Sequence, residues 1–289
     1  MPDLPQARFR ATIHYDGTAF RGWQLQPEER TVQREVESAL SRLLSTERRV
    51  LAAGRTDSGV HAVGQEISFE APDTWRPRDL HRGLNALLPA DVWIERLDRT
   101  EPDFHPRFAA VGRRYEYLAS DRPEGSSPIL GGRVWDLGAR RSLDVEKLTE
   151  ISGSILGKQS FLAFSKSGQP ERGTLCTVEC AGWERSPPGL LHFTVVADRF
   201  LHRMVRYVVA TIIEVAMGHR GPDELERLLA AGLVGESDPV PPIDRPTDEP
   251  RPPVPAPAWG LYLTGVRYAE GWNRPPGIPG IVRPNRTES

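Results

Sequence analysis

A short loop that holds an arginine and an aspartate contains the residue types in this chain that are best suited to chemistry. The loop reads Gly54-Arg55-Thr56-Asp57 and lies between two segments with the alternating pattern of β-strands. Glycine at positions 54 and 59 allows the backbone to turn tightly and to approach a ligand closely. Arg55 and Asp57 are two residues apart, so on an extended loop both side chains face the same way. A cation and a carboxylate together on an exposed loop favour a working site over a plain turn.

Asp57 is the main catalytic candidate, and its residue type allows two interpretations. A carboxylate beside an anomeric carbon can act as a nucleophile, or it can stabilise an oxocarbenium-like centre and accept a proton. An aspartate in a tight turn can instead hydrogen-bond the backbone of Ser58 and Gly59. His61 follows four residues after Asp57 and invites an acid–base role. A structural histidine on the next strand is the preferred interpretation of His61.

Motifs along the chain resemble those of the TruA-type tRNA pseudouridine synthases, whose catalytic aspartate lies in an Arg-Thr-Asp loop. The other matches follow the order of the family from Phe9 to about Val266. They are Tyr15-Asp16-Gly17-Thr18, Gly22-Trp23-Gln24, Thr31-Val32-Gln33, Leu84–Pro89, Phe104–Phe108, Arg114–Tyr117, Phe200–Arg206 and Gly260–Leu263. One such motif is a weak signal, whereas the ordered set is specific.

The resemblance implies a cofactor-free isomerase that converts uridine to pseudouridine in the anticodon arm of tRNA, at positions 38, 39 and 40. It also implies a cytoplasmic homodimer, in which one subunit helps to hold the tRNA that the other subunit modifies. Asp57 is then the catalytic aspartate. Arg55 would occupy the space of the unstacked base or clamp a phosphate, with a salt bridge inside the loop as its alternative.

Three residues of the second half of the chain also take roles from the resemblance. Arg206 matches the basic residue that pairs with the catalytic aspartate, a pairing that would keep Asp57 charged. Tyr115 matches the tyrosine that contacts the target base, although strand tyrosines often only pack. Leu261 matches the leucine that lines the base pocket, and it would also suit an ordinary core position. Tyr117 is predicted to belong to the core.

A stripe of arginines follows one predicted helix face. Arg199, Arg203 and Arg206 occur at i, i+4 and i+7 of a helix predicted over 200–217. Most such stripes are simply solvated. Arg199 and Arg203 are predicted to contact phosphates of the RNA.

Two copies of one element order predict an α+β protein made of two ferredoxin-like (βαββαβ) halves. We expect the halves to share a mixed, mainly antiparallel sheet with a central cleft, as the resemblance also implies. The predicted first half, 8–100, has strands at 9–15 and 48–53, a strand that ends at Phe69, a strand at 92–97, and helices from Thr31 and from Pro77 to about Leu88. The predicted second half, 105–268, has strands at 109–119, 175–183, 190–197 and 261–266 and helices at 144–156 and 200–217. A proline-rich insertion at 237–257 and a mobile tail at 271–289 complete the prediction.

The net charge of −2 is unevenly distributed along the chain. Residues 237–257 sum to −2 and residues 199–220 to +3, and RNA binding depends on such local charge rather than on the total. No apolar run approaches the roughly 20 residues of a membrane helix. The N-terminus lacks the pattern of a secretory signal. Cys176 and Cys180, which would share one face of a strand, are predicted to be reduced thiols, and no zinc-binding spacing is present.

Two other classes of function stay open at this stage. Two ferredoxin-like halves could bind RNA without reacting, as RRM-like sheets do. A carboxylate hydrolase that uses Asp57 with His61 is the other alternative, although it would want a second acidic group. The combination of Asp57, Arg55 and Arg206 favours the isomerase, because simple binding does not need it.

Overall fold

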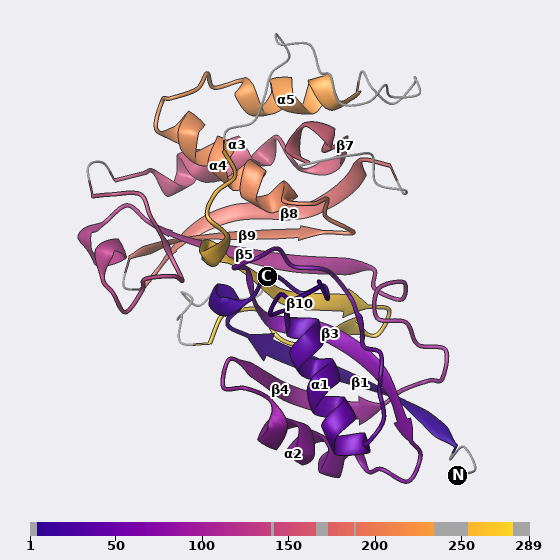
Figure 1. The fold of residues 1–289 in the computed structure, drawn as a ribbon. Helices are drawn as coiled ribbons and strands as arrows, with labels where there is room; N and C mark the ends of the chain where they lie inside the picture. Colours follow the sequence, from indigo (N-terminus) through magenta and orange to yellow (C-terminus); the bar gives the residue numbers. More distant parts are fainter. Residues whose placement is uncertain (1–4, 140–141, 166–172, 188, 234–253, 280–289) are drawn as a thin grey trace. The chain divides into compact units, whose positions relative to one another are not determined.

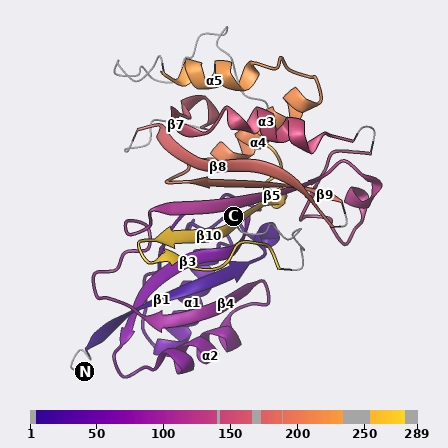
Figure 2. The same cartoon turned by 180° about the vertical axis from the view of Figure 1, so that it is seen from behind.

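The computed structural model describes residues 5–139, 142–165, 173–187, 189–233 and 254–279, shown in Figures 1 and 2. Helices and strands alternate along the chain, which gives the mixed α+β architecture that the sequence predicts. The described residues divide into two compact units. Unit 1 comprises those of Met1–Arg113 and Tyr262–Pro279, and unit 2 those of Arg114–Leu261.

Unit 1 begins with the predicted order of strand, helix, strand, strand, helix and strand. Its elements are β1 (Gln6–Tyr15), the 3-10 turn η1 (Gly17–Ala19), α1 (Val32–Leu44), β2 (Leu51–Ala52), β3 (His61–Pro72), α2 (Pro77–Leu87), β4 (Val92–Arg99), β10 (Leu261–Tyr268) and β11 (Gly271–Trp272). The strands follow one another across the sheet as β4-β1-β3-β10, with β2 paired to β3 and β11 to β10. The two helices lie on the same face of this sheet (Figure 1).

Local sequence signals account for the helix boundaries in unit 1. Thr31 caps α1, because its side chain accepts a hydrogen bond from the backbone N–H of Arg34 at 3.3 Å. The helix ends at Ser45, whose φ of 54° is left-handed. Pro77 opens α2 at its first turn, where the missing N–H costs nothing.

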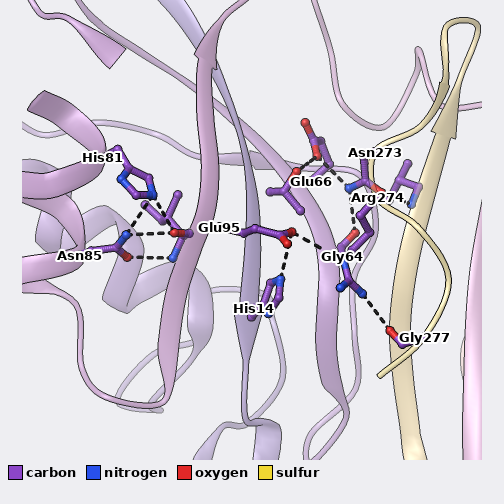
Figure 3. Close-up of polar contacts among 12 residues, drawn as sticks. His14, Gly64, Glu66, His81, Asn85, Glu95, Asn273, Arg274 and Gly277 are labelled. Atoms are coloured by element: carbon purple, nitrogen blue, oxygen red, sulfur yellow. Dashed lines mark hydrogen bonds and ion pairs between the residues drawn. The ribbon is translucent and has the colours of Figure 1, made fainter. Parts of the chain in front are cut away.

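Asn85 attaches α2 to the neighbouring strand β4 (Figure 3). Its side-chain amide donates to the carbonyl of Ile94 at 2.9 Å and accepts from the N–H of the same residue at 2.8 Å. His81 lies one turn earlier on α2, and its Nε2 is 2.9 Å from the same carbonyl. This two-sided contact fixes the helix against the sheet edge.

Strand β10 joins unit 1 rather than the second half to which the sequence assigned it. It runs parallel to β3, with Tyr262 opposite His61. The rings of these two residues stack at 4.7 Å between centroids. A side chain on Gly64 would meet the backbone of Thr264 at 2.6 Å, so only glycine permits this close approach of the two strands.

The start of the predicted mobile tail packs onto unit 1. Asn273 is buried and donates to the carbonyl of Gly64 at 3.1 Å and to the carboxylate of Glu66 at 2.9 Å (Figure 3). Arg274 follows it, and its guanidinium donates to the carbonyl of Gly277 at 2.9 Å. The remainder of the predicted tail, 280–289, lies outside the described residues.

Unit 2 contains its own strands and helices. Its elements are β5 (Gly112–Ser120), the 3-10 turn η2 (Pro123–Ser126), β6 (Trp135–Asp136), α3 (Val145–Gly153), β7 (Gly157–Ser160), the 3-10 turn η3 (Leu162–Phe164), β8 (Leu175–Ser186), β9 (Leu190–Ala197), α4 (Met204–Ala216), α5 (Glu224–Leu233) and the 3-10 turn η4 (Ala258–Gly260). The strand order is β5-β9-β8-β7, with β6 paired to β5. The antiparallel pair β8 and β9 confirms the predicted hairpin. The sequence did not predict β6, β7 or α5.

Two predictions for unit 2 need correction. Helix α4 begins at Met204 and not at Phe200, because Arg203 has a φ of 65°, which cannot continue a right-handed helix. Cys176 and Cys180 do not share a face, because the pairing register shifts between Val178 and Cys180. Most of the proline-rich insertion, 237–253, lies outside the described residues.

Candidate functional site

The loop that carries Asp57 connects β2 to β3 in unit 1. Arg55 is exposed, Asp57 is half-buried, and Thr56 between them is 7% exposed. The buried side chain therefore points inward and its two charged neighbours reach toward solvent. The predicted alternation of side chains on an extended loop is present here.

The loop ends in a tight turn that starts at Asp57. The backbone N–H of Val60 donates to the carbonyl of Asp57 at 3.1 Å, and Gly59 in the turn has a φ of +80°. A positive φ at the third residue of a four-residue turn is the position where glycine is favoured. The turn therefore fixes the main chain of Asp57 in one conformation.

A neighbouring segment clamps the loop through its backbone. The N–H of Trp23 donates to the carbonyl of Thr56 at 3.0 Å. The carbonyl of Phe20 accepts from the N–H of Gly59 at 3.3 Å and from the hydroxyl of Ser58 at 3.2 Å. These bonds hold the chain on both sides of Asp57.

Two glycines make this clamp possible. Gly22 has a φ of +91°, and a side chain there would lie 2.6 Å from the carbonyl oxygen of Thr56. A side chain on Gly17 would lie 2.1 Å from the carbonyl oxygen of Val60. Both glycines belong to motifs noted in the sequence, and close backbone packing explains why each must lack a side chain.

Buried polar side chains of β1 and β3 hydrogen-bond to the loop. The hydroxyl of Tyr15 lies 2.8 Å from Oγ1 of Thr56, and Gln65 donates from Nε2 to the carbonyl of Gly54 at 2.8 Å. Tyr15 is 4% exposed, and burial raises the pKa of its hydroxyl, which stays protonated and able to donate. The sequence did not identify Tyr15, Thr56 or Gln65 as supports, because these contacts join residues far apart in the chain.

His61, which the sequence analysis interprets as structural, is the first residue of β3. Its Nδ1 lies 3.1 Å from the backbone nitrogen of Gly17 and 3.2 Å from Oδ1 of Asp16. The ring is 3% exposed and stacks on Tyr262.

Arg206, predicted to pair with Asp57, lies in the first turns of α4 in unit 2. Its Nε donates to the carbonyl of Ala256 at 2.7 Å, and the N–H of Ala256 returns a bond to the carbonyl of Arg206 at 3.0 Å. Ala256 thus attaches the end of the proline-rich insertion to the helix and orients the half-buried guanidinium. Asp57 belongs to unit 1, and its pairing with Arg206 stays a prediction.

The predicted base-contacting residues lie in and beside β5 in unit 2. Tyr115 is 9% exposed and meets the ring of Phe200 edge to face, with 5.0 Å between the ring centroids. Tyr117 is fully buried and confirms the predicted core position. Leu261 is 5% exposed. A side chain on Gly260 would lie 2.6 Å from the ring of Tyr117, so only glycine allows the backbone just before Leu261 to pack against that ring.

The two arginines that precede α4 do not form a helical stripe with Arg206. Arg199 follows β9 and donates to the carbonyl of Gly173 at 2.6 Å. Arg203 has a left-handed backbone, and its Nε is buried without a hydrogen-bond partner among the described residues. Their predicted phosphate contacts therefore depend on turn geometry rather than on a helix face.

Within the part of the chain that the structure describes, histidine, cysteine, aspartate and glutamate side chains form no group of three that could hold a metal ion. No helix among those residues is long and apolar enough to cross a membrane.

Comparison with known proteins connects this chain to one family. The sequence profile described as "tRNA pseudouridine synthase" matches residues 11–109 and 152–269. A protein named tRNA pseudouridine synthase A from Methylacidiphilum infernorum is 38% identical, with 92% of this chain and 97% of the relative covered. Proteins of the same name from Chlorobium phaeovibrioides and Bacillus licheniformis are 35% and 34% identical, with 90% of this chain and 98% and 99% of each relative covered.

Proposed function

The chain belongs to the tRNA pseudouridine synthase family, isomerases that convert uridine to pseudouridine in tRNA, and we propose that it modifies uridines 38, 39 and 40 of the anticodon arm with Asp57 as its catalytic residue. Membership confirms the predicted pseudouridine synthase fold and the isomerase assignment. The proposal adds the part of the tRNA that is modified and the residues that act.

The construction of the Asp57 loop is the observation that carries the proposal. Tyr15, Gln65 and the 20–23 segment hold the loop, and Asp57 in it is half-buried. Catalytic groups need such fixed geometry, because a loosely held group loses much of its effective concentration at the reacting atom. An ordinary surface turn has no need of so many supports.

The reaction itself defines what the carboxylate must do. The bond between N1 of uracil and C1′ of ribose breaks, and a bond between C5 and C1′ forms. C5 loses a proton and N1 gains one, so atoms and electrons balance without an oxidant or reductant. Asp57 fits this chemistry either as a nucleophile or as a group that stabilises charge at the ribose and accepts a proton.

Arg55 is proposed to act beside Asp57 on the displaced nucleotide. It is exposed, and it forms no ion pair with any acid in the described residues, which favours a ligand role over a salt bridge within the loop. A target uridine must leave its stack before C1′ can be reached. A planar guanidinium can occupy the vacated space or clamp a neighbouring phosphate.

The residues of unit 2 complete the proposed machinery. Arg206 is proposed to keep Asp57 charged, Tyr115 to contact the target base and Leu261 to line its pocket. Arg199 and Arg203 are proposed to bind phosphates of the tRNA. The resemblance of the surrounding motifs to those of the family supports these roles. The family resemblance further supports a cytoplasmic homodimer in which each subunit helps to present tRNA to the other.

A single-turnover assay tests the catalytic assignment. Wild type, Asp57→Asn and the matched control Asp79→Asn, which changes a carboxylate on α2, are mixed with tRNA labelled with tritium at C5 of uridine. We expect tritium release by wild type and by Asp79→Asn and none by Asp57→Asn, with tRNA affinity retained in all three. Binding of tRNA without release by wild type would instead favour an RNA-binding module.

A further inference from the structure

An aromatic and basic loop of unit 1 has no role in the proposed chemistry. Phe108 is 60% exposed, which is unusual for so large an apolar side chain. Its ring lies 4.2 Å from the ring of His105, measured between centroids. Arg107 is exposed between them. An exposed aromatic face beside a cation is the pattern with which proteins hold unpaired nucleotides.

The loop is rigid despite its exposure. The guanidinium of Arg113 donates to the carbonyl of Arg107 at 2.9 Å and to that of Ala110 at 3.2 Å. The hydroxyl of Tyr268 donates to the carbonyl of Pro106 at 3.0 Å. A surface that is already ordered loses little conformational entropy when a ligand binds.

The same contacts attach this loop to the loop of Asp57. Arg113 donates from Nη2 to the carbonyl of Ala53 at 3.1 Å, and Ala53 directly precedes Gly54. Phe104 and Ala110, which flank the exposed residues, both pack against the cluster that contains Ala53. The aromatic loop and the Asp57 loop are therefore both attached to the same cluster around Ala53.

Arg107 is the cation next to Phe108, and the two acids of the same connection, Glu101 and Asp103, come before Phe104 in the chain. Burial, together with the nearby charges of Arg8 and Arg107, holds the pKa of His105 below its ordinary value. His105 is therefore neutral at pH 7, and its Nδ1 accepts from the N–H of Arg107 at 3.2 Å. The neutral ring serves as a flat backing for Phe108, and Arg107 supplies the cation.

We propose that Phe108 stacks an unpaired base of the tRNA and that Arg107 contacts the adjoining phosphate, as a second RNA contact beside the Asp57 loop. The inference rests on the proposed function, because it takes the RNA that Asp57 modifies as the ligand. The contact should strengthen RNA binding and leave the rate of the chemical step unchanged, since neither side chain needs to reach the reacting ribose.

Affinity and turnover of Phe108 variants test the proposal. Phe108→Ala should weaken binding of an anticodon stem-loop RNA by roughly 5- to 100-fold, the effect of losing one stacked base. The rate at saturating RNA should change by less than about threefold. Phe108→Trp should restore affinity, because it keeps an aromatic face. The control is Trp93→Ala, which removes another exposed aromatic ring of unit 1 and should leave affinity unchanged.

Crosslinking separates this inference from the proposed catalysis. p-Benzoylphenylalanine in place of Phe108 is introduced into the Asp57→Ala protein and irradiated with the same RNA. Crosslinks at 108, absent with the label at 93, would support the contact even if wild type produced no pseudouridine. An active wild type whose Phe108→Ala variant keeps its affinity, or a label at 108 that does not crosslink, would overturn the contact alone.

Discussion

The hydroxyl of Tyr15 lies 2.8 Å from Oγ1 of Thr56, the residue that directly precedes Asp57. Tyr15 is the last residue of β1, so this one contact joins the end of that strand to the loop. Together with the bond from Gln65 to Gly54, it fixes the chain on both sides of Arg55. The position of the two charged side chains is therefore set by buried hydroxyl and amide groups.

Removal of the Thr56 hydroxyl should impair turnover more than stability. Thr56→Val should lower kcat by about 10- to 100-fold with little change in KM, because the carboxylate of Asp57 loses its fixed position. The loss of unfolding free energy should be about 1–2 kcal/mol. Thr56→Ser, which keeps a hydroxyl, should recover most of the rate.

Thr174→Val is the matched control for this prediction. Thr174 is also buried, and its Oγ1 lies 2.8 Å from the hydroxyl of Ser160 in unit 2. Its loss should reduce stability to a similar extent and leave kcat unchanged. Equal losses of kcat in Thr56→Val and Thr174→Val would show that the Tyr15 contact serves stability alone. The measurements are steady-state kinetics and urea unfolding.

A methyl group at Gly22 should disturb the Asp57 loop directly. It would lie 2.6 Å from the carbonyl oxygen of Thr56, so the loop must move if the chain is to fold. Gly22→Ala should therefore reduce kcat by at least about 10-fold. Gly138→Ala is the control, because its φ of +75° is similarly left-handed but no atom lies within 4 Å of the added carbon.

Both glycine variants should lose about 1–3 kcal/mol of stability from the strained backbone. Only Gly22→Ala should lose activity as well. The comparison uses thermal unfolding together with tritium release. Full activity in a folded Gly22→Ala protein would mean that the loop geometry is not needed for catalysis.

Local signals made the first half of the fold predictable. The cap at Thr31, the proline at Pro77 and the alternation along β1 each act within a few residues. The sequence also placed Arg55 and Asp57 on one loop, because glycines and flanking strands identify such loops.

The remaining features depend on contacts that no local pattern contains. The start of α4 depends on a left-handed Arg203, a conformation that arginine rarely adopts. The partner of β10 is a strand about 200 residues away, which gives no signal in sequence spacing. Likewise, the bond between Tyr15 and Thr56 spans 41 residues. The predicted strand alternation identifies Tyr15 as buried but not as a support for the loop.

The pair of Asp121 and Arg185 should make unit 2 sensitive to acid. Two parallel bonds of 2.9 and 2.7 Å join the guanidinium to the carboxylate. Burial opposes ionisation of Asp121, but Arg185 and the N–H of Leu143 outweigh it and hold the pKa below its ordinary value. A lowered folded-state pKa means that the stabilisation is full above about pH 4 and is lost as the pH falls through the lower value.

Asp121→Asn should therefore cost about 3 kcal/mol of unfolding free energy at pH 7, because Arg185 keeps its charge without a counter-ion. The difference from wild type should begin to shrink below about pH 4, where Asp121 becomes protonated in the unfolded wild type. Asp73→Asn, which breaks an exposed pair with Arg99, should cost less than about 1 kcal/mol. Urea unfolding at pH 7 and pH 3.5 measures both. A difference that persists unchanged at pH 3.5 would refute the assigned charge effect.

The two cysteines should differ sharply in reactivity. Cys176 is 1% exposed, and burial raises the pKa of its thiol to about 12, whereas Cys180 is exposed. A thiol-specific reagent at pH 8 should therefore modify one thiol quickly in the native protein and two after denaturation. Cys180→Ser should remove the fast reaction. Rapid modification of Cys180→Ser would show that β8 opens readily.

Site-resolved mapping of pseudouridine on an unmodified tRNA transcript tests the central claim most directly. The transcript is incubated with wild type, Asp57→Ala or Asp79→Asn, and pseudouridine is then located by chemical modification and primer extension. We predict new stops at uridines 38, 39 and 40 with wild type and Asp79→Asn, and none with Asp57→Ala. Stops at those positions with Asp57→Ala would contradict the catalytic role of Asp57, and wild-type stops elsewhere in the tRNA would contradict the proposed target.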